Sequence, residues 1–282
     1  MALIASVGTP TLNQTVPYVD NVKLPLIGAY TGGEFIYSKT HPSLFTTRPA
    51  YSQESYELTN KLIDYKKYSQ IAVFYQDDAY GLSGMKGVMK AVKEKGLELV
   101  ARGKNVRDSF DVAEAISIIS EANPDCIILL STVKPNLTFL AEWKKLGKAC
   151  KFAVITGGAP DSLKANAPDL MEGALTSQSV PYFLSEDIPA AKEYVSLLKK
   201  NYPEAKPNYV GFETFISTKI CIEALKKLGS NISRENLIEV LEGMSDIDVG
   251  WGKTISFSKK NHNGSDNVWI MEIIKGDYVE VK

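Results

Sequence analysis

The chain has 282 residues, of which 44% are hydrophobic and 23% charged, so it can bury the core of one large or two ordinary globular domains. Lysine and arginine number 32 against 33 acidic residues, and a net charge of -1 argues against nucleic acid as a partner. No apolar run is long enough to cross a membrane, and the first residues lack the basic segment of a signal peptide. We therefore expect a soluble chain without an export signal of its own.

Cysteine and histidine usage excludes several kinds of site. Cys126, Cys150 and Cys221 are too widely spaced for a disulfide framework or a zinc knuckle, and Cys126 lies in "CIILL", a run typical of a buried strand. The two histidines, His41 and His262, lie in polar loops, and no H-E-x-x-H motif occurs. We therefore expect no metal, no cofactor and no catalytic residues.

Apolar strand-like runs alternate with amphipathic helical runs along nearly the whole chain. Strands are expected at 3–7, 26–29, 70–75, 98–102, 125–131, 151–156, 174–179 and 268–274, and helices over 52–68, 111–123, 188–203 and 212–229. Several of the strand runs are continuously apolar, as in parallel sheets that are covered on both faces. The alternation predicts an α/β fold with mostly parallel sheets flanked by helices.

The stretch "QIAVFYQDDAYGLSGMKGVMKAVKEKG", residues 70–96, resembles a nucleotide-binding turn. Its glycines Gly81, Gly84 and Gly87 follow a strand, but they lack the close first pair of a dinucleotide fingerprint, and the preceding aspartates would repel phosphate. The favoured interpretation is that the glycines let a helix approach a sheet closely. A nucleotide-dependent enzyme that uses the turn at 76–87 remains an alternative.

Polar residues follow three of the predicted strands at the ends where α/β sheets hold ligands. Thr9 follows the first strand, Ala29 ends the second and Thr31 comes after it, and Tyr80 follows the third. Because these turns offer hydroxyls, backbone groups and a phenol, the sequence predicts a cleft suited to hydrogen bonding.

The order of these segments is similar to that of a known family. The chain resembles the periplasmic solute-binding proteins of branched-chain amino-acid type in "VGTPTLNQTVPYVDNVKLPLIGAYTGGEF", "IAVFYQDDAYGLSGMKGVMKAVKEKGLELV", "SFDVAEAISIISEANPDCIILLST", "ALTSQSVPYF", "PNYVGFETFISTKICIEALKKLG" and "NVWIMEIIKGDY". The similarity covers essentially the whole chain. It implies two hinged Rossmann-like α/β lobes, the type I periplasmic binding protein fold.

The resemblance also implies lobe boundaries. Crossings are expected near 49–53, 179–182 and 258–265, so lobe one comprises 1–50 and 182–258 and lobe two comprises 51–181 and 259–282. Loop-rich stretches at 30–55 and 176–190 fall near the first two crossings. Relatives have further βα units before the "GTPT" turn, so we expect an N-terminally truncated lobe one with an exposed sheet edge, which a partner or self-association would cover.

The resemblance implies a ligand site residue by residue. Thr9, Ala29 and Thr31 match the lobe-one groups that hold a ligand carboxylate, and Tyr80 matches a lobe-two tyrosine. Val133 stands where relatives have a second aromatic residue, and Thr156 stands where they have the acidic residue that receives an ammonium group. Because threonine carries no charge, we expect a carboxylate without an amine, an aromatic acid or an amide, unless Asp77, Asp161 or Glu213 supplies the charge.

The implied function is non-enzymatic. A small polar molecule that is carboxylate-, amide- or amino-acid-like would be trapped between the lobes and delivered to a membrane ABC permease, with a periplasmic or extracytoplasmic location. A sensor or receptor module of the same fold is an alternative. Tyr80→Ala is expected to weaken binding and to leave the fold intact.

Overall fold

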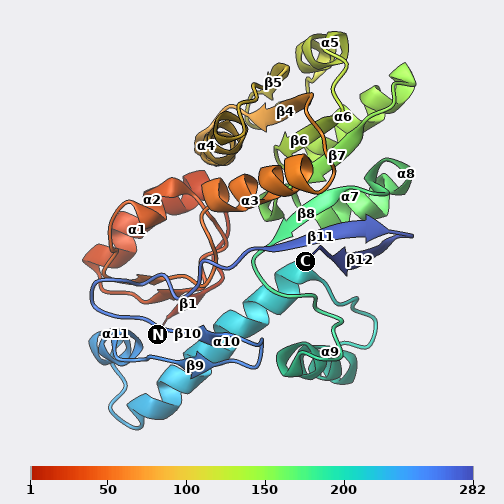
Figure 1. Ribbon diagram of the computed structural model, residues 1–282. Helices are drawn as coiled ribbons and strands as arrows, with labels where there is room; N and C mark the ends of the chain where they lie inside the picture. The colour runs from red at the N-terminus through yellow and green to blue at the C-terminus, as the bar shows by residue number, and fades with distance from the viewer. Residues whose placement is uncertain (1, 282) are drawn as a thin grey trace. The chain divides into compact units, whose positions relative to one another are not determined.

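A computed structural model describes residues 2–281, and the chain divides into two compact units (Figure 1). Unit 1 comprises Met1–Thr31, Phe35–Pro49 and Ser179–Asn267, and unit 2 comprises Gly32–Glu34, Ala50–Gln178 and Val268–Lys282. Apart from the short segment Gly32–Glu34, which belongs to unit 2, the units change at 49/50, 178/179 and 267/268, whereas the crossings predicted from the sequence lie near 49–53, 179–182 and 258–265.

Unit 1 is built on a small parallel sheet. Its elements are β1 (Leu3–Ile4), α1 (Thr9–Asn21), β2 (Leu26–Ile27), most of α2 (Glu34–Tyr37), β3 (Leu44–Phe45), α9 (Pro189–Asn201), α10 (Tyr209–Leu228), α11 (Arg234–Glu242), β9 (Ile247–Asp248) and β10 (Thr254–Ile255). The strands pair in the order β1-β2-β3, and β9 and β10 form a separate antiparallel pair.

Apolar residues of one face of α1 form the core of this sheet. Leu12, Val16 and Val19 recur at helical spacing and pack with Leu26 and Leu44 of the strands. The long helix α10 contacts β1 and β2. Within the described residues β1 is an outer strand of its sheet, and its backbone can pair further on one side only.

Unit 2 carries a seven-stranded mixed sheet. Its elements are α3 (Tyr51–Asp64), β4 (Ile71–Gln76), α4 (Ala79–Glu94), β5 (Ala101–Asn105), α5 (Ala113–Glu121), β6 (Cys126–Leu130), α6 (Val133–Leu146), β7 (Lys151–Val154), the 3₁₀ turn η1 (Thr156–Gly158), α7 (Pro160–Asn166), α8 (Pro168–Met171), β8 (Leu175–Gln178), β11 (Trp269–Ile274) and β12 (Asp277–Glu280). The strand order is β12-β11-β8-β7-β6-β4-β5, with parallel pairing from β8 to β5 and antiparallel pairing at β11 and β12.

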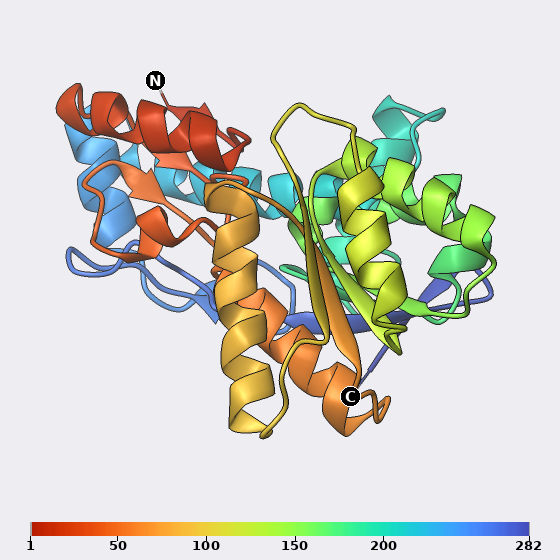
Figure 2. The ribbon, with the colours of Figure 1, turned by 90° about the horizontal axis from the view of Figure 1, so that it is seen from above.

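Both faces of this sheet are covered by helices (Figure 2). Residues of α3 and α4 pack with alternate residues of β4 and β6, such as Val73 and Ile128, on one face. On the other face Phe74 of β4 stacks on Phe139 of α6 at 4.4 Å between ring centroids, and Trp143 continues the stack. These observations confirm the predicted α/β fold with a mostly parallel sheet, and they place Trp143 in the core.

The three glycines of α4 allow close packing, as the sequence predicts, but not all against the sheet. A Cβ atom at Gly81 would lie 2.0 Å from the carbonyl oxygen of Gln76, and one at Gly84 would lie 2.9 Å from Leu130 of β6. A Cβ atom at Gly87 would instead lie 1.9 Å from the carbonyl oxygen of Ser52 in α3. Gly87 therefore brings two helices together.

Burial controls the chemistry of the cysteine thiols. Cys126 is buried in β6, as predicted, and desolvation raises its pKa well above the ordinary value. Desolvation, together with the nearby Asp125 carboxylate, raises the pKa of Cys150 to about 12. Both thiols stay protonated at neutral pH and are weak nucleophiles.

Alkylation of Cys150 by iodoacetamide at pH 8 is therefore expected to be at least about tenfold slower in the folded protein than in denaturant, because only the thiolate reacts. Mass spectrometry of the modified peptides measures this ratio. The unfolded chain releases the proton near pH 9 and the folded protein holds it up to about pH 12. The linked stability is thus complete below pH 9 and is lost as the pH rises toward 12. Equal rates in both states would contradict the assignment.

Candidate functional site

Three predicted site residues of unit 2 follow neighbouring parallel strands. Tyr80 lies in the first turn of α4 after β4, Val133 begins α6 after β6, and Thr156 begins η1 after β7. Because β4, β6 and β7 are adjacent and parallel, their carboxyl ends lie at one edge of the sheet. The fold therefore places all three residues at the edge where α/β sheets bind ligands.

Tyr80 is positioned by the cap of its helix and by packing. The Asp78 carboxylate accepts hydrogen bonds from the backbone N–H groups of Tyr80 and Gly81 and so caps α4. The Tyr80 ring packs edge-on against Tyr51 at 5.0 Å, and a Cβ atom at Gly157 would lie 2.4 Å from it. Tyr80 is only 4% exposed and belongs to the core of unit 2, so Tyr80→Ala is expected to cost stability as well.

Thr156 contacts a buried carboxylate that the sequence analysis did not identify. Its backbone N–H and its hydroxyl donate to the Glu54 side chain at 3.1 and 2.8 Å, and the Ser177 hydroxyl donates to the same carboxylate at 2.8 Å. Glu54 is fully buried in the first turn of α3, where the helix dipole favours negative charge. Thr156, predicted as a neutral ligand group, thus has an acidic side chain behind it.

The predicted residues of unit 1 also lie close together. Thr9 is the first residue of α1, Thr31 follows β2, and their hydroxyl oxygens are hydrogen-bonded at 2.7 Å. The backbone N–H of Thr31 donates to the carbonyl oxygen of Ala29 at 2.9 Å. All three residues are buried at the carboxyl ends of β1 and β2.

The amino-acid sequence matches a known protein family over nearly its whole length. The family model described as "Periplasmic binding protein" matches residues 1–277. The chain belongs to the periplasmic binding protein family. The Leu/Ile/Val-binding protein homolog 7 of Brucella abortus (strain 2308) is 24% identical over an alignment of 222 residues, which covers 75% of this chain and 54% of that protein. The chain thus spans about half the length of the curated relatives it matches.

Solved structures show the same fold. A possible leucine/isoleucine/valine-binding protein from Rhodopirellula baltica SH 1 superposes with a TM-score of 0.92 at 24% identity, covering 100% of this chain and 77% of that chain. A fatty acid ABC transporter substrate-binding protein from Thermomonospora curvata superposes with a TM-score of 0.86 at 18% identity, covering 99% of this chain and 74% of that chain. The predicted resemblance, and with it the type I periplasmic binding protein fold, is confirmed.

The sequence suggested three acidic residues as the countercharge for a ligand amine, but in this periplasmic binding protein they have other partners. Asp77 forms an ion pair with Lys104, and Asp161 accepts a hydrogen bond from the Tyr278 hydroxyl. Glu213 of α10 lies 3.2 Å from the Arg48 guanidinium and accepts a hydrogen bond from Ser179. The carboxylate beside Thr156 is Glu54, whose donors lie more than 100 residues away in sequence.

The same geometry argues against a nucleotide at the turn of residues 76–87. Phosphate binding at a helix N-terminus uses the first backbone N–H groups, and the Asp78 carboxylate already accepts from two of them. Asp78 also pairs with Arg107 at 2.8 Å. Within residues 2–281, no group of three or more histidine, cysteine, aspartate or glutamate side chains could hold a metal ion, and no helix is long and apolar enough to span a bilayer.

Proposed function

We propose that this periplasmic binding protein binds a small polar solute outside the cytoplasm and delivers it to a membrane ABC permease. The observation that carries the proposal is the placement of Tyr80, Val133 and Thr156 at the ends of three adjacent parallel strands. The hydrogen-bonded pair Thr9 and Thr31 occupies the corresponding strand ends of unit 1. Groups of both units would contact one ligand, and the family assignment supports a binding protein rather than an enzyme.

The ligand is proposed to be a small carboxylate, amide or amino-acid-like molecule. A fold shared with proteins named for leucine, isoleucine and valine and for fatty acids accommodates carboxylates with and without an amine. The argument against an amine depended on the neutral Thr156. Since the Glu54 carboxyl group lies behind that threonine, a neutral residue at position 156 no longer argues against an amine, and an amino acid remains a candidate beside acids and amides.

A thermal-shift screen against amino acids, other carboxylic acids and amides tests the proposal. A ligand at 100 times its Kd stabilises the folded state by about 2.7 kcal/mol, which raises the Tm by roughly 5 °C or more in a protein of this size. Absence of a shift with all three classes would count against solute binding by this chain.

Self-association over the β1 edge is proposed separately, and sedimentation measures it.

Tyr80→Phe is the sharpest single test of the site. It removes only the hydroxyl, so the packing against Tyr51 is kept. Loss of one hydrogen bond is expected to lower the affinity for the ligand found in the screen about threefold to tenfold. Titration calorimetry measures the change. Tyr278→Phe is the matched control, because that buried hydroxyl bonds Asp161 instead. Unchanged affinity of the Tyr80 variant would remove Tyr80 from the site.

A further inference from the structure

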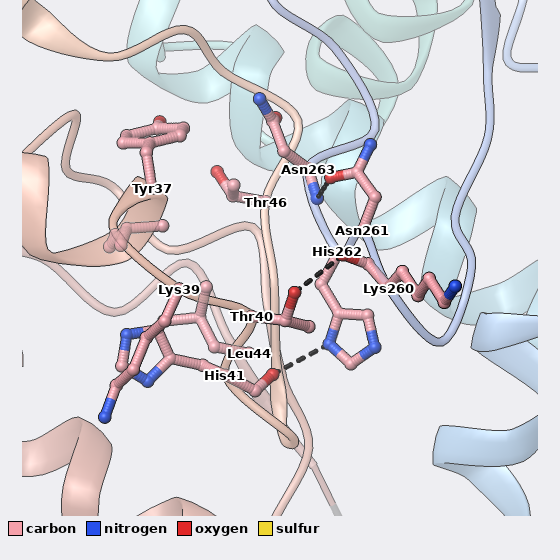
Figure 3. A pocket seen from close by; sticks show the side chains of 11 residues that line it. Tyr37, Lys39, Thr40, His41, Leu44, Thr46, Lys260, Asn261, His262 and Asn263 are labelled. Atoms are coloured by element: carbon pink, nitrogen blue, oxygen red, sulfur yellow. Dashed lines mark hydrogen bonds between the residues drawn. The ribbon is translucent and has the colours of Figure 1, made fainter.

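Unit 1 contains a pocket of about 370 Å³ that involves none of the predicted site residues (Figure 3). Two chain segments form its walls, one from α2 to β3 and one in the loop before β11. The lining residues are Ile36, Tyr37, Lys39, Thr40, His41, Leu44, Thr46, Lys260, Asn261, His262 and Asn263. The volume suits a molecule of the size of a small organic acid.

Hydrogen bonds fix the two walls against each other. The Thr40 hydroxyl donates to the carbonyl oxygen of Lys260 at 2.7 Å, and the His262 ring nitrogen Nδ1 lies 2.8 Å from the carbonyl oxygen of His41. The backbone N–H of Thr46 donates to the carbonyl oxygen of His262 at 2.9 Å. These bonds join segments about 220 residues apart in sequence, so the pocket is preformed.

The two histidines that line this pocket are buried, although both lie in loops of polar sequence. His262 stacks on Phe45 of β3 at 4.0 Å between ring centroids. His41 lies 3.0 Å from the Asp20 carboxylate, and His262 lies 3.3 Å from the Glu242 carboxylate. The carboxylates of Asp20 and Glu242 thus lie within hydrogen-bonding distance of the two imidazole rings. None of the described residues that line the pocket is acidic.

The polar groups at the pocket are mainly donors. Each wall contributes one exposed lysine, Lys39 or Lys260, and neither forms an ion pair with a residue between 2 and 281. The side-chain oxygen of Asn261 accepts from the backbone N–H of Asn263, and that of Asn263 accepts from Ser265. Their amide N–H₂ groups remain as donors.

We propose that this pocket binds a small anion with several negatively charged oxygen atoms, a di- or tricarboxylate or a phosphate. The exposed side chains of Lys39 and Lys260 extend in opposite directions in Figure 3, and their flexible stems would turn toward a bound anion to supply the countercharge. The asparagine amides supply directional hydrogen bonds. This site is independent of the proposed solute site, because it shares no residue with it.

Titration calorimetry with citrate and with inorganic phosphate, at constant ionic strength, tests the proposal on the full chain. Saturable one-site binding of at least one probe is expected. Lys39→Glu/Lys260→Glu should weaken it about tenfold or more, because two attractive charges become repulsive. The neutral change Asn263→Ala should weaken it by a smaller factor. Lys199→Glu/Lys200→Glu at the end of α9 is the matched control, with an equal charge change on exposed residues of the same unit.

Each outcome decides between interpretations. Binding of citrate alone identifies a polycarboxylate as the ligand class, and binding of phosphate identifies a phosphate. Absence of saturable binding for both probes overturns the proposal. Equal losses in the two double variants also overturn it, because they would show general attraction of anions rather than a site. Circular dichroism of the variants confirms that the fold is retained.

Discussion

Glu54→Leu is expected to destabilise unit 2 by about 3 kcal/mol or more, because it leaves three buried donors without their acceptor. These are the backbone N–H and hydroxyl of Thr156 and the hydroxyl of Ser177. Each unsatisfied buried donor costs about 1–3 kcal/mol, and the hydroxyls recover part of this cost by rotating. The leucine would also remove the carboxyl group behind the predicted ligand residue Thr156.

Glu54→Gln is the matched control for this change. Its amide oxygen still accepts from Thr156, and the Ser177 hydroxyl can turn to accept from its N–H₂ group, so a smaller loss than with leucine is expected. Hydrogen exchange of amides in β6 and β7 reports the stability of unit 2 itself, since the two units need not unfold together. Equal stability of the leucine variant and the natural chain would show that the carboxylate does not hold η1 to α3.

Gly87→Ala is expected to destabilise the packing of α3 on α4 by about 2 kcal/mol or more. The added methyl group would lie 1.9 Å from the carbonyl oxygen of Ser52 and 2.3 Å from the Ser55 hydroxyl, so the helices must separate. Separation also lengthens the hydrogen bond from the Ser55 hydroxyl to the carbonyl oxygen of Gly84, which is 2.6 Å. The better helix propensity of alanine returns only about 1 kcal/mol.

Gly243→Ala tests whether the clash, and not the loss of glycine, is responsible. Gly243 ends α11 with a φ of -90°, and a Cβ atom there would meet its nearest neighbour at an ordinary 3.5 Å. A change within about 1 kcal/mol, of stabilising sign, is expected. Urea unfolding followed by circular dichroism compares the variants. A Gly87 variant as stable as the Gly243 variant would contradict the close approach.

The parallel sheet of unit 2 could be predicted because its central strands leave a local signal. Cys126–Leu130 is continuously apolar and continuously buried, as a strand covered on both faces must be. The range predicted for β5, 98–102, begins three residues before the observed strand Ala101–Asn105. The buried residues of this strand are small or polar, so no hydropathy pattern marks its position. The two-residue strand β3 was missed, since its pairing depends on β2 and not on its own length.

The candidate site likewise contains residues that local sequence could predict and residues that it could not. The position of Tyr80 at the edge of the sheet could be predicted because chain order alone brings parallel strand ends to one edge, whereas Val133 and Thr156 came from the family resemblance alone. Glu54 could not be predicted, because its donors are 102 and 123 residues away and an acidic residue in the first turn of a helix is ordinary. The pocket beside His262 depends in the same way on two distant segments.

The strand β11 has a consequence for synthesis on the ribosome. It pairs with β8 along Trp269–Glu272, yet it is made about 90 residues later, after all of the unit 1 segment Ser179–Asn267. A nascent chain that ends before residue 268 would expose β8 as an unpaired edge, a template for association with other chains. The strands β11 and β12 therefore cover the edge of β8, and termination before them would yield an aggregation-prone product.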